Sequence, residues 1–153
     1  MPARAAACAA LCLALAAPAW AQGPFAGPWT VAASFPAPWV PPGTHPPEAA
    51  ALRAARIVFA RDRLSAPGWM ACPAPRYDIR SVPAEGLFEG GLHDPAAGRA
   101  DAPGLARGLG VAQPETPTLS VRCHGIQFHL AAPDLILFAL DNRIYRLHRA
   151  GNR

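Results

Sequence analysis

The sequence predicts a small α+β domain: a curved, mostly antiparallel sheet or small partial barrel, with one or two packed helices and one disulfide. Two observations lead to this prediction. The stretch 118–149 alternates apolar and polar residues over much of its length, which is typical of neighbouring β-strands. Two cysteines, Cys72 and Cys123, form an even pair downstream of an N-terminal leader. We expect about six or seven strands in the sheet.

The N-terminus predicts a secretory signal peptide over residues 1–21. Arg4 supplies a positive charge, residues 5–17 form an apolar segment, and Ala-Trp-Ala at 19–21 fits the small-x-small cleavage rule. The apolar segment is shorter than the ~20 residues that a membrane-spanning helix needs. We therefore expect cleavage after Ala21, a periplasmic or secreted location, and no transmembrane segment once the leader is removed.

Removal of the leader leaves a chain of about 130 residues, which is enough for one domain. It also leaves Cys72 and Cys123, which in an oxidising compartment most simply form a disulfide. Closing a loop of about 50 residues would constrain the unfolded chain by roughly 4 kcal/mol. Two separate buried thiols are the alternative.

The composition argues against nucleic acid as a partner. All basic charge in the chain is arginine, the formal net charge is +4, and the arginines are scattered rather than gathered in one basic stripe. The 19 prolines, 13 glycines and absence of lysine are typical of a GC-rich bacterial genome.

The rest of the chain divides into three parts. Residues 22–43 form a Pro- and Trp-rich N-terminal arm with one strand over 29–34, and the two tryptophans of the arm are expected to cover the core. The α+β domain itself spans 44–149, and 150–153 is a short tail.

Within the domain, we expect a helix first. Thr44 can cap a helix that begins with Pro-Pro-Glu at 46–48 and continues through 49–56, where a narrow apolar stripe would lie on the sheet. Strands follow at 57–60 and 77–82, where β-branched and aromatic residues are frequent. A further short helix is expected near 105–109.

The stretch 118–149 predicts three or four antiparallel strands. Residues 126–130 alternate apolar and polar side chains, which indicates one buried face. Residues 135–140 are all apolar, which indicates a central strand buried on both faces. The Asp-Asn pair at 141–142 predicts a two-residue turn, and alternation resumes at 145–148, so the segment closes as a hairpin.

A glycine-rich segment at 85–92 is the candidate binding site. As a recognition loop it would offer Leu87 and Phe88 as apolar contacts, with Glu85 and Glu89 beside them. The alternative is a tight turn whose apolar residues fold back onto the sheet. The usual burial of large apolar side chains favours that alternative.

No motif for catalysis or metal binding stands out. His124 and His129 are an odd number of residues apart, so on one strand they would face opposite sides and could not share an ion. The serines lack a nucleophile motif and lysine is absent. We therefore expect no metal and no cofactor, and an enzymatic role stays an open alternative.

Three segments carry a resemblance: EGLFEGGL at 85–92, VRCHGIQFHLA at 121–131 and LILFALDNRIYRLHR at 135–149. With the short LGV run between the first two, they resemble a group of small exported proteobacterial proteins of unassigned function, over nearly the whole chain from Trp29 onward. This resemblance implies a periplasmic, disulfide-containing domain. A looser similarity, carried by the strands around Cys123 and the hairpin after it, is to periplasmic lysozyme inhibitors.

The inhibitor resemblance implies a protein partner. Lysozymes of the c type are basic and their inhibitors tend to be acidic, whereas this chain is basic, so its acidic loop would have to face such a partner. The sequence therefore favours a non-enzymatic periplasmic interaction protein, possible contacts being Glu85, Leu87, Phe88 and Glu89, with an envelope partner that the sequence does not identify. The alternative is a cell-envelope hydrolase that uses carboxylates near the 85–92 loop.

Overall fold

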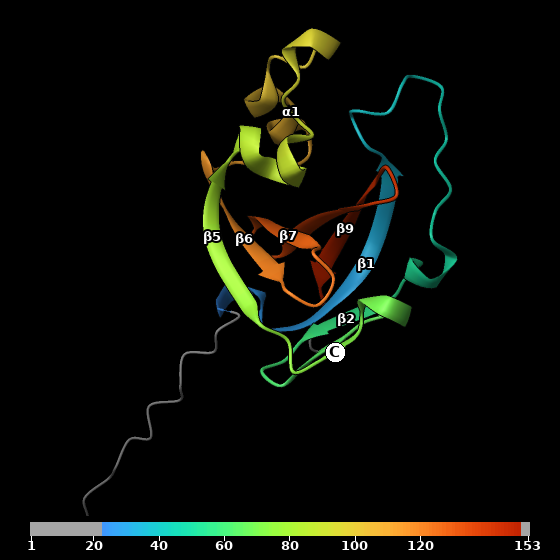
Figure 1. The fold of residues 1–153 in the computed structure, drawn as a ribbon, viewed down its shortest axis with the longest axis vertical. Coiled ribbons are helices and arrows are strands. Elements are labelled where there is room, and N and C mark those ends of the chain that lie inside the picture. The colour runs from blue at the N-terminus through green and yellow to red at the C-terminus, as the bar shows by residue number, and fades with distance from the viewer. Residues whose placement is uncertain (1–22, 151–153) are drawn as a thin grey trace, which may run out of the picture.

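A computed structural model describes residues 23–150 and contains one nine-stranded antiparallel sheet, curled into a half-barrel (Figure 1). The predicted curved antiparallel sheet is thus confirmed, with more strands than expected. The predicted signal peptide lies outside the described residues. The strands are arranged in the order β4-β3-β2-β1-β9-β8-β7-β6-β5. Their bounds are β1 Gly27–Pro36, β2 Arg56–Phe59, β3 Arg63–Ser65, β4 Cys72–Pro73, β5 Tyr77–Pro83, β6 Glu115–Val121, β7 Gln127–Ala132, β8 Leu135–Leu140 and β9 Arg143–Arg149.

Helical structure is a minor part of the described chain, so the α+β label fits only loosely. The α-helix α1 spans Ala102–Gly108, close to the short helix expected near 105–109, and Asp101 caps it by accepting a hydrogen bond from the Gly104 amide. Five 3₁₀ segments accompany it: η1 Gly23–Phe25, η2 Ala50–Leu52, η3 Gly68–Met70, η4 Ala84–Gly90 and η5 Pro95–Ala97. None of the helices between residues 23 and 150 has the length and apolar character needed to span a bilayer.

The helix predicted over 46–56 is wrong. Only the single 3₁₀ turn η2 forms there, and two residues after its end Ala54 has a φ of 52°. Glu48 does not lie in a first helical turn, and its carboxylate accepts a hydrogen bond from the Ser34 hydroxyl on β1. Contact with the sheet has therefore overridden the helix propensity of the alanine-rich sequence.

The N-terminal segment is part of the sheet and not separate from it. Strand β1 lies between β2 and β9 and pairs with both. Trp29 on β1 is fully buried, its indole N–H donates to the Phe25 carbonyl at 2.7 Å, and the Arg149 guanidinium lies 4.3 Å from its ring centroid. The expected core role of Trp29 is confirmed.

Side chains from the middle of the sheet alternate between two cores. On one face, Phe138 of β8 stacks on Tyr145 of β9, with ring centroids 5.0 Å apart, inside the half-barrel core. On the other face, Leu137 and Ile144 belong to a second core together with residues of η4 and α1. Strand β8 is thus buried on both sides, as its apolar sequence predicted. The β8–β9 turn also forms as predicted.

The disulfide joins opposite ends of the sheet. Cys72 belongs to β4, at one edge, and its bonded partner Cys123 lies in the turn that follows β6, next to the other edge strand. The Tyr77 hydroxyl of β5 donates to the Ala60 carbonyl at 3.0 Å and so also connects the two ends. The predicted Cys72–Cys123 link is confirmed, and it holds the curled sheet at the place where its edges approach each other.

Candidate functional site

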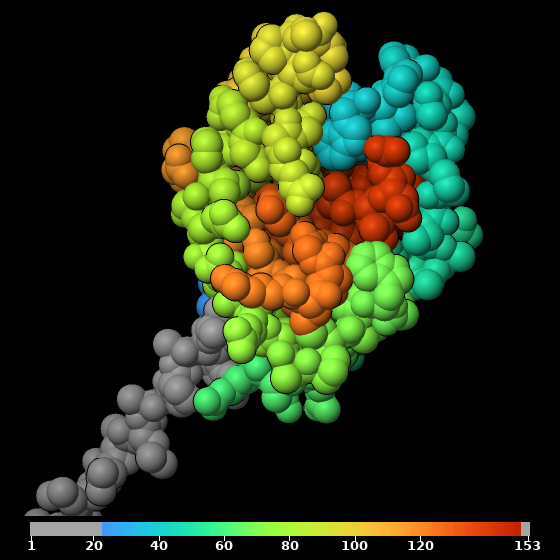
Figure 2. Space-filling model, viewed as in Figure 1, coloured from blue at the N-terminus to red at the C-terminus, as the bar shows by residue number. Residues whose placement is uncertain are grey.

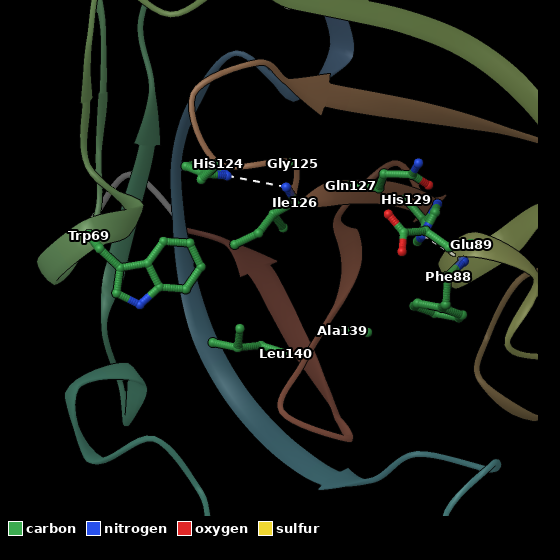
Figure 3. A pocket seen from close by; sticks show the side chains of 10 residues that line it. All are labelled: Trp69, Phe88, Glu89, His124, Gly125, Ile126, Gln127, His129, Ala139 and Leu140. Carbon is green, nitrogen blue, oxygen red and sulfur yellow. Dashed lines mark hydrogen bonds between the residues drawn. The ribbon is translucent and has the colours of Figure 1, made fainter.

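A cavity of about 230 Å³ opens beside the disulfide, and Figure 3 labels the 10 residues that line it. They come from four parts of the fold that are distant in sequence. Trp69 belongs to η3, Phe88 and Glu89 belong to η4, and the others come from the β6–β7 turn with the start of β7 and from the end of β8. The curl of the sheet brings these parts together.

Trp69 and His124 form one wall of the cavity. Their rings meet edge to face with centroids 5.8 Å apart, and Trp69 keeps 60% of its surface exposed. Trp69 lies three positions before Cys72, and His124 directly follows Cys123. The disulfide therefore fixes the approach of these two side chains.

The imidazole of His124 is held as one tautomer. Its Nδ1 accepts from the Ile126 amide at 3.2 Å, so in the neutral ring the proton lies on Nε2. That nitrogen is buried and has no hydrogen-bond partner of good geometry. Burial lowers the pKa of His124, although the Met70 backbone opposes the shift in part. The ring is thus neutral at pH 7.

The opposite wall is the turn in η4, which a buried histidine fixes. His129 Nε2 accepts a hydrogen bond from the Phe88 amide at 3.1 Å. Its Nδ1 lies 2.9 Å from the Thr118 hydroxyl, which donates its own proton to the Thr116 carbonyl. His129 Nδ1 must therefore carry the proton. Every polar atom of this imidazole is satisfied, and burial lowers the pKa of His129 to about 4, so the ring is neutral at pH 7.

Glu89 is held in an unusual backbone conformation at the edge of the cavity. Phe88 and Glu89 have φ values of 52° and 57°, in the left-handed region that non-glycine residues rarely adopt. Figure 3 shows the Glu89 carboxylate across the cavity from the Trp69 ring. Glu89 is exposed, and no ion pair with it occurs among residues 23–150. Its charge is therefore free to meet a ligand.

The structure separates the four predicted binding residues. Phe88 and Glu89 line the cavity, but Leu87 is fully buried in the second core and Phe88 exposes only 8% of its surface. Glu85 is exposed and borders a different hollow, next to α1. The geometry agrees with the tight-turn interpretation of 85–92: Leu87 and Phe88 are mainly core residues, and Glu89 is an exposed residue that lines the cavity.

No sequence pattern indicated Trp69, His124 or Gln127 as residues of a binding site. One signal was available: Trp69 and His124 lie close in sequence to Cys72 and Cys123 respectively, so a Cys72–Cys123 link places them close in space. Gln127 carried no such signal, because its position at the cavity depends on where β7 begins.

The chemistry of the cavity suits binding. Its floor is apolar, with Ile126 and Leu140, and its polar side chains are one carboxylate, one amide, one indole and two neutral imidazoles. A glycosidase site would present two convergent carboxylates, whereas Glu89 is the acid that lines this cavity. Within the described part of the chain, no group of three or more His, Cys, Asp or Glu residues is placed to hold a metal ion.

Comparisons of the chain with models of known protein families, with curated proteins and with solved structures found no match.

Proposed function

We propose that this chain is an exported, non-enzymatic binding protein of the cell envelope, and that its cavity receives a cationic side chain from a protein partner. The observation that carries the proposal is the unpaired Glu89 carboxylate, which faces the exposed Trp69 ring across an apolar floor. A binding site for an arginine or lysine side chain needs these components.

Charge favours a cation over a neutral ligand. A neutral ligand that covers Glu89 would remove its carboxylate from water without a counter-charge, which costs free energy. A cation would pair with it. The indole face of Trp69 can add a cation–π contribution of about 0.5–2 kcal/mol. The aliphatic stem of an arginine or lysine would pack on Ile126 and Leu140.

Gln127, which lines the same cavity, favours a peptide-borne cation. Its side-chain amide can donate a hydrogen bond to a backbone carbonyl of the bound segment. One polar donor and one carboxylate in the same cavity would then fix both the backbone and the side chain of the same residue.

The compartment part of the proposal rests on the leader and the disulfide. A secretory signal peptide and a disulfide that closes the sheet both suit the periplasm or the cell exterior. A basic envelope protein, such as a c-type lysozyme, is one candidate partner, in line with the inhibitor-like resemblance of the sequence. The free carboxylate would locally offset the repulsion between two basic proteins.

The experiment is a titration of residues 22–153 with N-acetyl-arginine methylamide, followed by NMR of the backbone amides. We expect weak binding, with shifts centred on Trp69, His124 and Gln127. Glu89→Gln should weaken it about tenfold, as expected for loss of a partly desolvated ion pair. Asp134→Asn, which removes an equal charge from the exposed β7–β8 turn, is the matched control and should change nothing.

Two results would count against the proposal. If the arginine ligand causes no amide shifts, or binds the Glu89→Gln variant as tightly as the original chain, the cavity does not select cations. Cleavage of peptidoglycan by the unmodified chain, lost in the Glu89→Gln variant, would favour the hydrolase alternative.

A further inference from the structure

The cavity is one end of a longer groove. A second hollow of about 550 Å³ shares Phe88, Glu89, Ala139 and Leu140 with it. A third, of about 570 Å³, shares a border of Trp39 and the β8–β9 turn with the second. The segments that form these borders meet on the face that Figure 2 turns to the viewer: residues near 69 in green, η4 in yellow-green, and the β8–β9 turn in red.

Aromatic rings lie at two positions along this groove. Trp69 lies at the first end, and Trp39 lies where the second and third hollows meet. The Trp39 indole N–H donates to the Asn142 side chain at 3.1 Å, and its ring lies 5.8 Å from that of Phe88, between centroids. Trp39 is therefore held in place, with part of its ring at the surface.

An unpaired carboxylate lies near each of these two rings. Glu89 borders the first two hollows and Asp141 borders the second and third, and no ion pair with either occurs among residues 23–150. Between them, Asp94 neutralises Arg99, with 3.1 Å from carboxylate oxygen to guanidinium nitrogen. The net charge along the groove is therefore negative, on a chain whose net charge is positive.

The groove can also bind a polypeptide backbone. The side-chain amides of Gln127 and Asn142 line it. Each can donate a hydrogen bond to a carbonyl group of an extended peptide. A neutral chain of sugars would also accept from these donors, but it would leave Glu89 and Asp141 without counter-charges.

We propose that this groove binds an extended polypeptide segment with two cationic side chains, one beside Glu89 and Trp69 and the other beside Asp141 and Trp39. The inference rests on the proposed function, because the first of the two positions is the cavity described above. It adds a second position and makes the spacing between the two cations the determinant of specificity.

The test uses residues 22–153 and a series of acetylated, amidated peptides with two arginines separated by one to five alanines. Calorimetry compares them with N-acetyl-arginine methylamide. Two linked contacts raise affinity sharply only when the linker spans the sites, so one spacing should bind at least tenfold more tightly than the single arginine. Asp141→Asn should abolish that gain without weakening the binding of the single arginine. Glu89→Gln should weaken the binding of both ligands.

The variants are chosen so that folding does not confuse the result. Asp141 has φ of 49°, a conformation that asparagine tolerates well, so Asp141→Asn preserves the turn. Asp134→Asn is again the control for charge alone. Equal melting temperatures for all variants show that the fold is intact.

Three outcomes would overturn the inference, and they differ in whether the single-cavity function survives. If Asp141→Asn has no effect but Glu89→Gln weakens both ligands, the groove proposal fails and the single-cavity function survives. If neither variant affects any ligand, both fail. If chitotetraose binds and loses affinity with Trp69→Ala while no peptide binds, the groove is a glycan site and the polypeptide is excluded.

Discussion

Trp69 and His124 lie edge to face at 5.8 Å between ring centroids, although 55 positions separate them in the sequence. Each belongs to one of the two segments that the Cys72–Cys123 disulfide joins. Within the described chain, the sheet has β4 and β5 as its edge strands, and the disulfide lies where those edges approach. The bond that closes the fold thus also assembles one wall of the candidate site.

Loss of the disulfide should therefore affect stability and binding together. Replacing Cys72 and Cys123 with serine should lower the free energy of unfolding by about 2–5 kcal/mol, because the unfolded chain regains the freedom of a long loop. Urea denaturation measures the change. At temperatures where the variant is still folded, its affinity for the arginine ligand should fall as Trp69 and His124 separate. Unchanged affinity in a folded variant would show that the wall forms without the bond.

Phe88→Ala should destabilise the domain. The Phe88 ring packs 4.6 Å from the ring of His129 and 5.8 Å from that of Trp39, between centroids, and it exposes 8% of its surface. Removing a buried phenylalanine side chain costs about 3 kcal/mol or more. Glu85→Ala is the exposed control in the same turn and should cost little. A melting temperature unchanged by Phe88→Ala would restore the interpretation of Phe88 as a surface contact.

Stability should fall as the pH falls from about 6.5 to about 4. Burial lowers the pKa of His129 to about 4 in the folded state, whereas the unfolded chain takes up its proton near the ordinary value of 6.5. The contribution of His129 is complete above the unfolded pKa and is lost as the pH falls through the folded one, by about 3 kcal/mol in all. Urea denaturation at pH 7, 5 and 4 measures it.

His129→Gln isolates that contribution. The glutamine cannot take up a proton, so the variant should be less stable than the original chain at pH 7 and should lose less stability between pH 7 and 4. Burial also lowers the pKa of His124, and carboxylates titrate at the acid end, so some pH dependence should persist. Parallel pH profiles for the two proteins would mean that His129 is not the group responsible.

The strands were predictable because their signal is local. Residues 135–140 are apolar at every position, and a strand between two cores needs that pattern. The helix over 46–56 was predicted from equally local signals and failed, since this segment bonds to distant strands, Glu48 to Ser34 on β1 and Ala49 to Tyr145 on β9. Local patterns therefore located the strands but not the segments whose conformation depends on distant partners.

The candidate site shows the same limit. Glu89 was identified from composition, as an acid in a glycine-rich loop. The fully buried position of Leu87 depends on the core that η4 shares with α1, and the sequence does not specify that packing. Trp69 and His124 could have been paired through the neighbouring cysteines, whereas the Asp141 position in the groove required the three-dimensional arrangement of η4 against the β8–β9 turn.

Glu89→Gly should stabilise the fold and weaken binding. The φ of Glu89 is 57°, and for an L-residue other than glycine the left-handed region costs about 1 kcal/mol. Glycine relieves that strain but loses more entropy on folding, so a net gain of about 0.5 kcal/mol is expected. Strained backbone that persists at a surface position is often retained for function. The affinity for the arginine ligand should fall at least as far as in Glu89→Gln.

Glu85→Gly provides the matched comparison for this last prediction. Glu85 is in the same turn and is also exposed, but its φ is not positive, so glycine there should cost about 0.5–1 kcal/mol and leave binding intact. Urea denaturation measures the stability of both variants, and we expect it to rise for Glu89→Gly and to fall for Glu85→Gly. Calorimetry measures the affinity of both variants for the arginine ligand. If both substitutions destabilise the fold equally, the backbone of Glu89 is not strained. Its left-handed conformation would then be no evidence for a binding role.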